Sequence, residues 1–139
     1  EPENNIHVII KAYIDSNIET PLVVVGDFSS HKYKAEIMEI TNTNPQKNIL
    51  FTGGIYEQNT LNMLRQKCFA YLHGHSVGGT NPSLLEIMVM KTVIVAHDNL
   101  FNREVCKDAA VYFKDSNDLK NKMEMINENI DDFLILKEK

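Results

Sequence analysis

The segment of this chain best suited to chemistry runs from His73 to Glu86 and reads HGHSVGGTNPSLLE. It leads from an apolar run into the start of a helix. Pro82 suits the first helical turn because its missing N–H would have had no partner there, and Asn81 or Ser83 can cap the helix. We therefore expect a glycine-rich loop that ends at an exposed helix N-terminus.

This helix start could bind an anion. The peptide N–H groups of Ser83, Leu84 and Leu85 point out of the first turn, and the positive end of the helix dipole adds to them, which makes a seat for a diphosphate. Glu86 lies about one turn further on, where its carboxylate could accept two hydrogen bonds from a vicinal diol such as a ribose. An alternative stays open, because Ser83 and Glu86 also have the spacing of a capping box, in which the glutamate only satisfies a helix-start amide.

The elements that must position this loop alternate along the chain. Short apolar runs closed by turn residues predict buried parallel strands, and apolar residues at three- and four-residue spacing predict helices. The expected strands cover residues 22–25, 49–51, 69–72, 93–96 and 110–113. The expected helices cover residues 5–17, 30–42, 58–67, 82–90, 102–106 and 117 onward. This order predicts an α/β fold, a Rossmann-like doubly wound parallel sheet with helices on both faces, in a single domain over residues 1–139.

The glycines mark one edge of this sheet. Ligands of such sheets bind beyond the carboxyl ends of the strands, and every glycine of the chain falls in a segment that follows an expected strand. These residues are Gly26, Gly53, Gly54, Gly74, Gly78 and Gly79. Strand-to-helix turns favour glycine in any case, but the clustering on one edge favours a binding site there.

Composition excludes several classes of protein. With 43% hydrophobic and 24% charged residues the chain is neither disordered nor built around a membrane span. A formal net charge of −5 and the lack of a basic stripe argue against nucleic-acid binding. Cys68 and Cys106 lack CxxC spacing and sit among apolar neighbours, which favours reduced, packed thiols in a cytoplasmic protein.

Several motifs in unbroken order carry a family resemblance. They are Gly26-Asp after a valine strand, NILFTGGI at 48–55, PSLLEIM at 82–88, VIVA at 93–96 and NREV at 102–105. Together they resemble the C-terminal, donor-binding domain of the retaining GT-B glycosyltransferases of the group 1 or family 4 type. The loop before Glu86 further resembles a bacterial surface-polysaccharide subgroup described as rhamnosyltransferases. The opening EPENNI resembles the family segment after the first strand of that domain, which implies that this strand and the N-terminal domain are absent.

The resemblance implies binding roles for Glu86 and for the loop before the expected helix at 82–90. In the family, the second of two glutamates eight positions apart binds the nucleotide ribose, and Glu86 occupies that position, which favours ligand binding over capping. The first glutamate, which contacts the donor sugar, would fall at Gly78, where no carboxylate exists. The sugar is then held differently, for example by backbone amides of Gly79, Thr80 and Asn81.

Other parts of the site follow from the same resemblance. The turn at Gly54 and Ile55 should cradle the base. His75 could hydrogen-bond a phosphate or a sugar hydroxyl, or could have a purely structural role; a metal role for it is disfavoured, since no third ligand is spaced for one. Lys91 and Arg103 could neutralise phosphate, although solvated surface positions are the simpler interpretation for both.

The function implied is transfer of a sugar from a nucleoside diphosphate to a glycan or lipid-linked acceptor, with retention, in bacterial polysaccharide biosynthesis. No bound metal or other cofactor is expected. The acceptor, any membrane association at the inner face of the cell membrane, and any base would involve the missing half, so no catalytic residue is assigned, and this chain by itself should be inactive.

Two other classes of protein are alternatives to a transferase. A dinucleotide enzyme would need G-x-G-x-x-G after its first strand, and the residues after Gly26 lack it. A non-catalytic nucleotide-binding or phosphoacceptor-like interaction module would need aspartates clustered at the strand ends, whereas Asp27 and Asp98 stand far apart in the sequence. This module is the alternative function.

Overall fold

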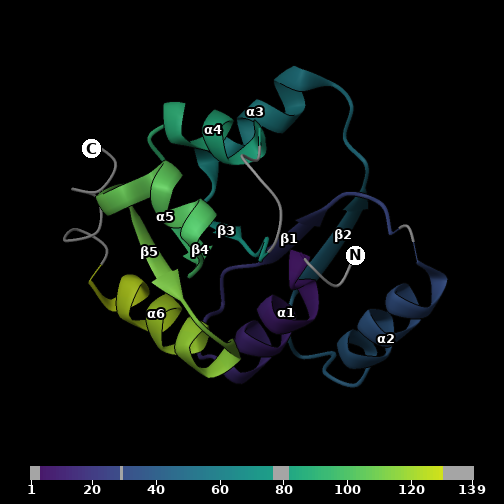
Figure 1. The fold of residues 1–139 in the computed structure, drawn as a ribbon. Coiled ribbons are helices and arrows are strands. Elements are labelled where there is room, and N and C mark those ends of the chain that lie inside the picture. The colour runs from purple at the N-terminus through teal and green to yellow at the C-terminus, as the bar shows by residue number, and fades with distance from the viewer. Residues whose placement is uncertain (1–3, 29, 77–81, 130–139) are drawn as a thin grey trace.

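The computed structural model describes residues 4–28, 30–76 and 82–129, and in these ranges strands and helices alternate as the sequence predicts (Figure 1). The strands are β1 (Leu22–Val25), β2 (Ile49–Gly53), β3 (Tyr71–His73), β4 (Ile94–His97) and β5 (Ala110–Phe113). The helices are α1 (Ile6–Asp15), α2 (His31–Asn42), α3 (Gln58–Lys67), α4 (Pro82–Val89), α5 (Leu100–Cys106) and α6 (Ser116–Glu128), with a 3₁₀ turn, η2, at Lys107–Ala109.

The strands form two parallel sheets rather than the single sheet expected. One sheet has the order β1-β2 and the other the order β3-β4-β5. Leu22 lies opposite Ile49 in the first sheet, and Tyr71 lies opposite Ile94 in the second. Among the described strands, β1 and β3 are therefore edge strands. The α/β class with parallel strands is confirmed, and the continuity of the sheet is corrected.

Helices cover both faces, as a doubly wound fold requires. We call the two faces after one helix each. On the α1 face, α1 and α6 pack against residues from both sheets, including Leu22, Ile49, Leu72 and Val95. α2 packs beside α1 on the same face, over β1 and β2. In Figure 1 these three helices lie together below the sheets.

On the opposite face, which we call the α4 face, the cover is incomplete. Leu84 and Ile87 of α4 and Cys106 of α5 pack on Ile94 and Ala96 of β4. The β1-β2 sheet has no such cover there: Val23 and Val25 are each 40% exposed and Leu50 is 48% exposed. Because successive side chains of a strand point to opposite faces, these exposed residues share the α4 face.

Local sequence explains the element boundaries. Ser30 caps α2 as expected, since its Oγ accepts from the Tyr33 N–H at 3.2 Å. Asn99 caps α5 in the same way, so that α5 begins two residues before the expected start at Asn102. β3 begins at Tyr71 rather than at Phe69, which is 36% exposed. No helix within the described ranges is long and apolar enough to cross a lipid bilayer.

Candidate functional site

The loops after β1, β2 and β3 border one cleft. Parallel strands place their carboxyl ends at the same edge of a sheet, and here a cleft of about 910 Å³ opens between the two sheets and reaches that edge. The cleft residues contributed by these loops are Gly26, Asp27, Gly54, Ile55, Tyr56, Gly74 and His75. The structure thus brings three of the expected site residues, Gly54, Ile55 and His75, to one cleft.

Asp27 fixes the turn after β2. Its carboxylate accepts the Gly54 N–H at 3.2 Å and the Tyr56 hydroxyl at 2.9 Å. A Cβ on Gly54 would lie 2.5 Å from the Tyr56 hydroxyl oxygen and 2.8 Å from Asp27 Oδ2, so a side chain there would displace the pair that these two groups form. The hydrogen bond to the Asp27 carboxylate raises the pKa of Tyr56. The turn that the resemblance assigns to the base is therefore held in place by a carboxylate from the neighbouring strand end.

Glu86 forms an ion pair with Arg65. The Arg65 Nη1 group on α3 donates to Glu86 Oε2 on α4. The arginine side chain is 9% exposed and the glutamate side chain is 48% exposed. Arg65 lines the cleft, whereas Glu86 adjoins it through this contact. One carboxylate oxygen is thus held by a buried cation while the side chain stays half open to solvent.

The capping-box alternative for Glu86 does not fit this geometry. α4 begins at Pro82, so Ser83 lies inside the helix and not at its N-cap position. Four residues of helix therefore precede Glu86, instead of the two that a capping box places between the cap and the glutamate. The Glu86 Oε2 atom instead accepts a hydrogen bond from Arg65 of α3.

Two histidines follow one another along the end of β3. The rings of His73 and His75 stack with centroids 4.8 Å apart, and His73 also stacks on Tyr71 at 6.0 Å. His73 is 2% exposed, and its buried Nε2 has no hydrogen-bond partner among the described residues. Burial lowers the pKa of His73 to about 4, with a smaller effect from His75, and burial also lowers the pKa of His75. Both rings are therefore neutral at pH 7.

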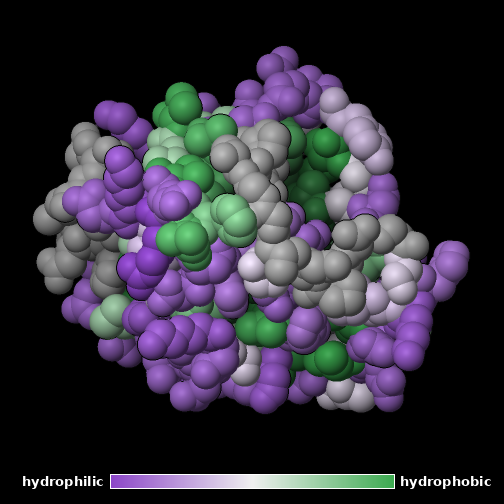
Figure 2. All heavy atoms as spheres, in the orientation of Figure 1, coloured by the Kyte–Doolittle hydropathy of each residue, from purple (hydrophilic) through white to green (hydrophobic). Residues whose placement is uncertain are grey.

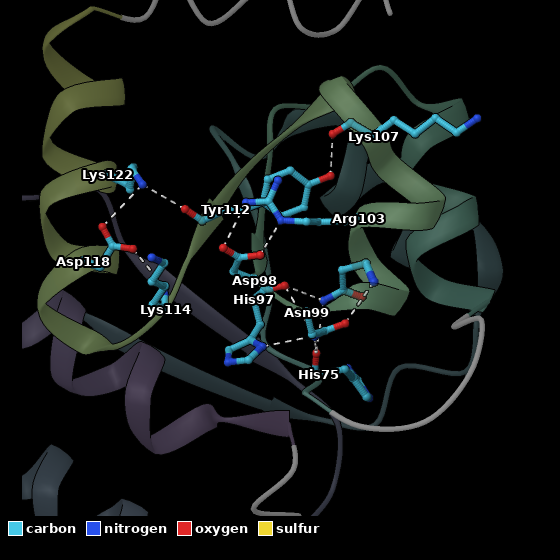
Figure 3. Close-up of polar contacts among 11 residues, drawn as sticks. His75, His97, Asp98, Asn99, Arg103, Lys107, Tyr112, Lys114, Asp118 and Lys122 are labelled. Carbon is cyan, nitrogen blue, oxygen red and sulfur yellow. Dashed lines mark hydrogen bonds and ion pairs between the residues drawn. The ribbon is translucent and has the colours of Figure 1, made fainter.

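Two asparagines hold the backbone of His75, which precedes the glycine-rich loop. Figure 3 shows one of them, Asn99, beside His75. Asn102 Nδ2 donates to the carbonyls of His75 at 3.1 Å and His97 at 2.9 Å, and Asn99 Nδ2 donates to the His75 carbonyl at 2.9 Å. Asn102 is buried, with 4% exposure. The start of α5 thus ties the carboxyl end of β4 to the segment that leads toward α4.

Residues after β4 make structural contacts. Arg103 binds the Asp98 carboxylate with two donors and lies over the Tyr112 ring, 4.4 Å from its centroid (Figure 3). This pairing lowers the pKa of Asp98 and raises the pKa of Arg103, in each case first through their hydrogen bond. Arg103 therefore fits the surface interpretation better than a phosphate contact. Lys91 is exposed, with a positive φ of 54° at the end of α4.

The aspartates do not form a phosphoacceptor cluster. Asp27 is engaged by Gly54 and Tyr56, while Asp98 is engaged by Arg103. Within the described ranges, no group of three or more His, Cys, Asp or Glu side chains is placed to hold a metal ion. Within the described residues, the phosphoacceptor-like module therefore lacks the cluster of aspartates that it needs.

Part of the expected site lies outside the described residues. Gly78, Gly79, Thr80 and Asn81 fall there, as does the side chain of Ser83. Leu84 is 0% exposed and packs into the core between α4 and β4, so only its backbone could face a ligand.

The structure adds two residues that the sequence did not single out, Arg65 and Asn102. Arg65 looked like one of the polar residues of an amphipathic helix, and Asn102 like part of a short motif. Their roles arise from contacts with residues at least 21 positions away, Glu86 and His75, and no local pattern encodes such contacts.

Comparison with known proteins shows which fold and which family this chain resembles. None of the curated proteins matches the chain significantly. Three crystal structures of Alr3699/HepE from Anabaena match it over 99% of its length: the complex with UDP (TM-score 0.87, 16% identity), with UDP-glucose (0.86, 16%) and with UDP and glucose (0.87, 17%).

At this identity the likeness shows the fold alone, a Rossmann-like α/β fold with parallel sheets. The chain spans 39% of the length of those solved chains. The family model described as glycosyl transferases group 1 matches residues 1–139. The chain therefore belongs to the glycosyl transferases group 1 family.

Proposed function

We propose that this chain is the donor-binding half of a retaining glycosyltransferase and holds a nucleoside diphosphate sugar across the carboxyl edge of its sheets. Family membership supports transferase chemistry. The UDP and UDP-glucose complexes of the Anabaena protein support a nucleotide-sugar donor. The single observation that carries the proposal is the half-exposed Glu86 carboxylate, anchored on one oxygen by Arg65 beside the cleft.

Glu86 binds the ribose in this proposal. Arg65 orients the carboxylate and holds Oε2, which leaves Oε1 and the remaining lone pairs for the hydroxyls of a diol. A carboxylate that is oriented before the ligand arrives loses less side-chain freedom on binding, which favours affinity. Arg65 is then a positioning residue and does not touch the nucleotide.

The diphosphate is bound at the start of α4. Backbone N–H groups of Ser83 and Leu84 serve as donors, and the helix dipole favours the negative charge. The transition state is oxocarbenium-like, and charge gathers on the leaving diphosphate as the bond to the sugar breaks. Fixed amides stabilise that charge, so catalysis on this side is electrostatic and uses no protein nucleophile.

The base and the sugar are bound on either side of the diphosphate. The turn at Gly54 and Ile55, fixed by Asp27, cradles the base. Backbone amides of the loop at Gly78, Gly79, Thr80 and Asn81 hold the sugar in place of the carboxylate that the family has at Gly78. His75, neutral and at the cleft, offers a donor or acceptor to a phosphate or a hydroxyl.

The rest of the reaction belongs to the other half of the enzyme. The acceptor is a glycan or a lipid-linked glycan of bacterial surface polysaccharide, the sugar transferred is a hexose or rhamnose, and the reaction takes place in the cytoplasm at the inner face of the membrane. No bound metal is part of the proposal.

Ligand-observed NMR with uridine, thymidine and guanosine diphosphates, alongside NAD, tests the donor class. We expect saturable binding of one nucleoside diphosphate and none of NAD. Glu86→Gln should weaken that binding by about tenfold or more, because charge-assisted hydrogen bonds are worth roughly 1.5–3 kcal/mol. The matched control is Glu104→Gln, an exposed glutamate on α5, which should leave the affinity unchanged.

The ribose contact has its own test. If the preferred base is uracil, 2′-deoxy-UDP should bind more weakly than UDP to the natural chain but equally to Glu86→Gln. Binding of NAD alone, or a Glu86→Gln chain that folds and binds as well as the natural one, would exclude this function.

A further inference from the structure

Tyr56 is an exposed tyrosine whose side chain is nevertheless tied in place. It follows Gly54 and Ile55 in the turn after β2, and it is 88% exposed, the highest value among the large hydrophobic side chains that the structure describes. An exposed side chain ordinarily changes rotamer within nanoseconds. Here the far end of the side chain is bonded, because the Tyr56 hydroxyl donates to Asp27 Oδ2 at 2.9 Å. The ring is therefore held by its hydroxyl while most of its surface stays open to solvent.

The carboxylate that holds this ring has a fixed position of its own. Asp27 Oδ1 accepts the Gly54 N–H at 3.2 Å, so one carboxylate binds both the backbone of the turn and the tyrosine. The backbone also joins the two loops, since the Gly26 N–H donates to the Gly53 carbonyl at 2.8 Å. The loops after β1 and β2 thus form one unit, and Tyr56 projects from it.

This arrangement adds little to the core. Among the described residues, Tyr56 belongs to none of the buried hydrophobic clusters. Hydrophobic stabilisation is proportional to the apolar area removed from water, so a side chain that is 88% exposed contributes little to it. Tyrosines that are exposed and ordered are typical of binding surfaces, where a rigid amphipathic ring gives a large contact area at a low cost in conformational entropy. The ring of Tyr56 is therefore suited to contact with a ligand.

Tyr56 stands at the rim of the cleft, beside the turn to which the base is assigned. It borders the cleft together with Gly54 and Ile55. The hydroxyl end of its ring lies close over Gly54, because a Cβ on that glycine would be 2.6 Å from Tyr56 Cζ. In Figure 2 the segment between β2 and α3 forms one rim of a recess in which hydrophobic atoms are visible. A planar group that reaches the turn therefore meets an aromatic ring there.

We propose that the nucleotide base stacks on the ring of Tyr56, and that Asp27 is the positioning residue that holds this ring. The inference rests on the proposed function, which brings the base to the turn at Gly54 and Ile55. Backbone groups of Ile55 meet the edge of the base, whereas the tyrosine meets its flat face. Every base has such a face, so stacking adds affinity for each of them and leaves the choice of base to the backbone.

The experiment separates the ring from its hydroxyl. Tyr56→Leu removes the ring, and Tyr56→Phe keeps it and loses the bond to Asp27. Because the side chain is exposed, both variants should give the circular dichroism spectrum and melting temperature of the natural chain to within a few degrees. NMR titrations measure the affinity for UDP, TDP and GDP, and pyrophosphate serves as the probe that has no base.

We expect Tyr56→Leu to weaken binding of the preferred nucleoside diphosphate by about tenfold, on the scale of base stacking on aromatic side chains. Tyr56→Phe should lose about threefold at most, because an exposed hydrogen bond contributes little. Pyrophosphate should bind to all three chains alike, and the order of preference among the three nucleotides should stay the same in each.

The chemical shifts of the ligand give a second readout, which a purely structural role of Tyr56 would not move. Protons of the base should shift upfield on binding to the natural chain and to Tyr56→Phe, because they lie over the face of a ring. They should not do so with Tyr56→Leu.

Three results would overturn the proposal. Equal nucleotide affinity of the natural chain and Tyr56→Leu excludes stacking and leaves the donor site in place. A loss in Tyr56→Phe as large as in Tyr56→Leu excludes it too, because the hydroxyl alone would then account for the effect by holding the turn. If none of the three diphosphates binds to the natural chain, the proposed function fails and the stacking fails with it.

Discussion

Arg65 and Glu86 join α3 to α4 by an ion pair in which the cation is buried and the anion is half exposed. The backbone carbonyl of Arg65 also accepts the hydroxyl of Thr92 at 2.9 Å, which fixes the end of α3 to the segment before β4. Arg65 is therefore held through its backbone carbonyl and through its guanidinium. The guanidinium in turn orients the Glu86 carboxylate. This makes the pair a means of orienting one side chain at the edge of the cleft.

A double-mutant cycle tests that relationship. Arg65→Met and Glu86→Gln should each lower the free energy of unfolding by about 1–3 kcal/mol, since each leaves the other group without its charged partner. The double variant should lose less than the sum of the two, because the interaction can be lost only once. Urea unfolding followed by circular dichroism gives the energies. Strict additivity would mean that the two side chains do not interact.

The nucleotide affinity separates orientation from charge. Arg65→Lys keeps the positive charge but loses the planar fork that fixes a carboxylate. We expect it to weaken binding of the nucleoside diphosphate while Glu86→Gln in the same background causes no further loss. If Arg65→Lys binds as the natural chain does, the arginine does not position Glu86 for the ligand.

Acid should weaken the fold through His73. The folded-state pKa of about 4 lies below the ordinary histidine value of 6.5, so as the pH falls the unfolded chain takes up the proton first. The stability from the neutral ring is present above pH 6.5 and is lost as the pH falls toward 4, by up to about 3 kcal/mol. His73→Phe should flatten the fall between pH 6.5 and 5 in urea unfolding. The control His31→Gln, an exposed position at the start of α2, should keep it.

Gly74 should not tolerate a side chain. A Cβ there would lie 2.1 Å from the Asn4 carbonyl oxygen and 3.1 Å from Ile9 Cδ1. Gly74→Ala must therefore push the start of α1 away, with an expected loss of about 1–3 kcal/mol on the scale of overpacked cores. Asn5→Ala removes the hydrogen bond to Gly74 and also places alanine in the left-handed region, at φ 57°, so it should cost about 2 kcal/mol. A melting temperature unchanged in Gly74→Ala would show that α1 does not start against β3.

Asn102 should be needed for the backbone at His75. Asn102→Asp replaces a donor by an acceptor that faces two carbonyls, so we expect a loss of about 1–3 kcal/mol and weaker nucleotide binding. The control Asn62→Asp makes the same chemical change where the side-chain oxygen already accepts, from Gln58 Nε2 at 2.9 Å, and should be nearly neutral. Equal effects at both positions would remove the special role of Asn102.

The positions of the helices and strands were predicted from the sequence better than the pairing of the strands. Ser30 and the run from Leu22 to Val25 carry local signals for a cap and a strand, and both elements were confirmed. The expected burial of this strand was wrong, since Val23 and Val25 are each 40% exposed on the uncovered face. The division into two sheets has no local signal, because alternation of strands and helices does not say which strands pair. The position of β3 shifted because exposed Phe69 reads as an apolar strand residue in the sequence alone.

The candidate site shows the same difference. Gly54, Ile55 and His75 lie at one cleft. Their place could be predicted because the ends of strands and the glycines that follow them can be recognised from local sequence. Arg65 could not be found that way, since a charged residue on a helix is buried only when tertiary contacts make it so. The roles of Gly78, Gly79, Thr80 and Asn81 stay predictions, as do those of Glu86 and the backbone of Ser83 and Leu84.

α1 has neighbouring residues in two different cores. Ile9 packs with α6 and the central strands, while Ile10, the next residue, packs with Tyr33 and Ile37 of α2. A two-stranded sheet is marginal by itself in water, so β1 and β2 depend on this helix for their link to the rest. The β1-β2 sheet and the β3-β4-β5 sheet should therefore melt in one cooperative transition. Polar substitutions on either side of α1 should unfold both sheets together.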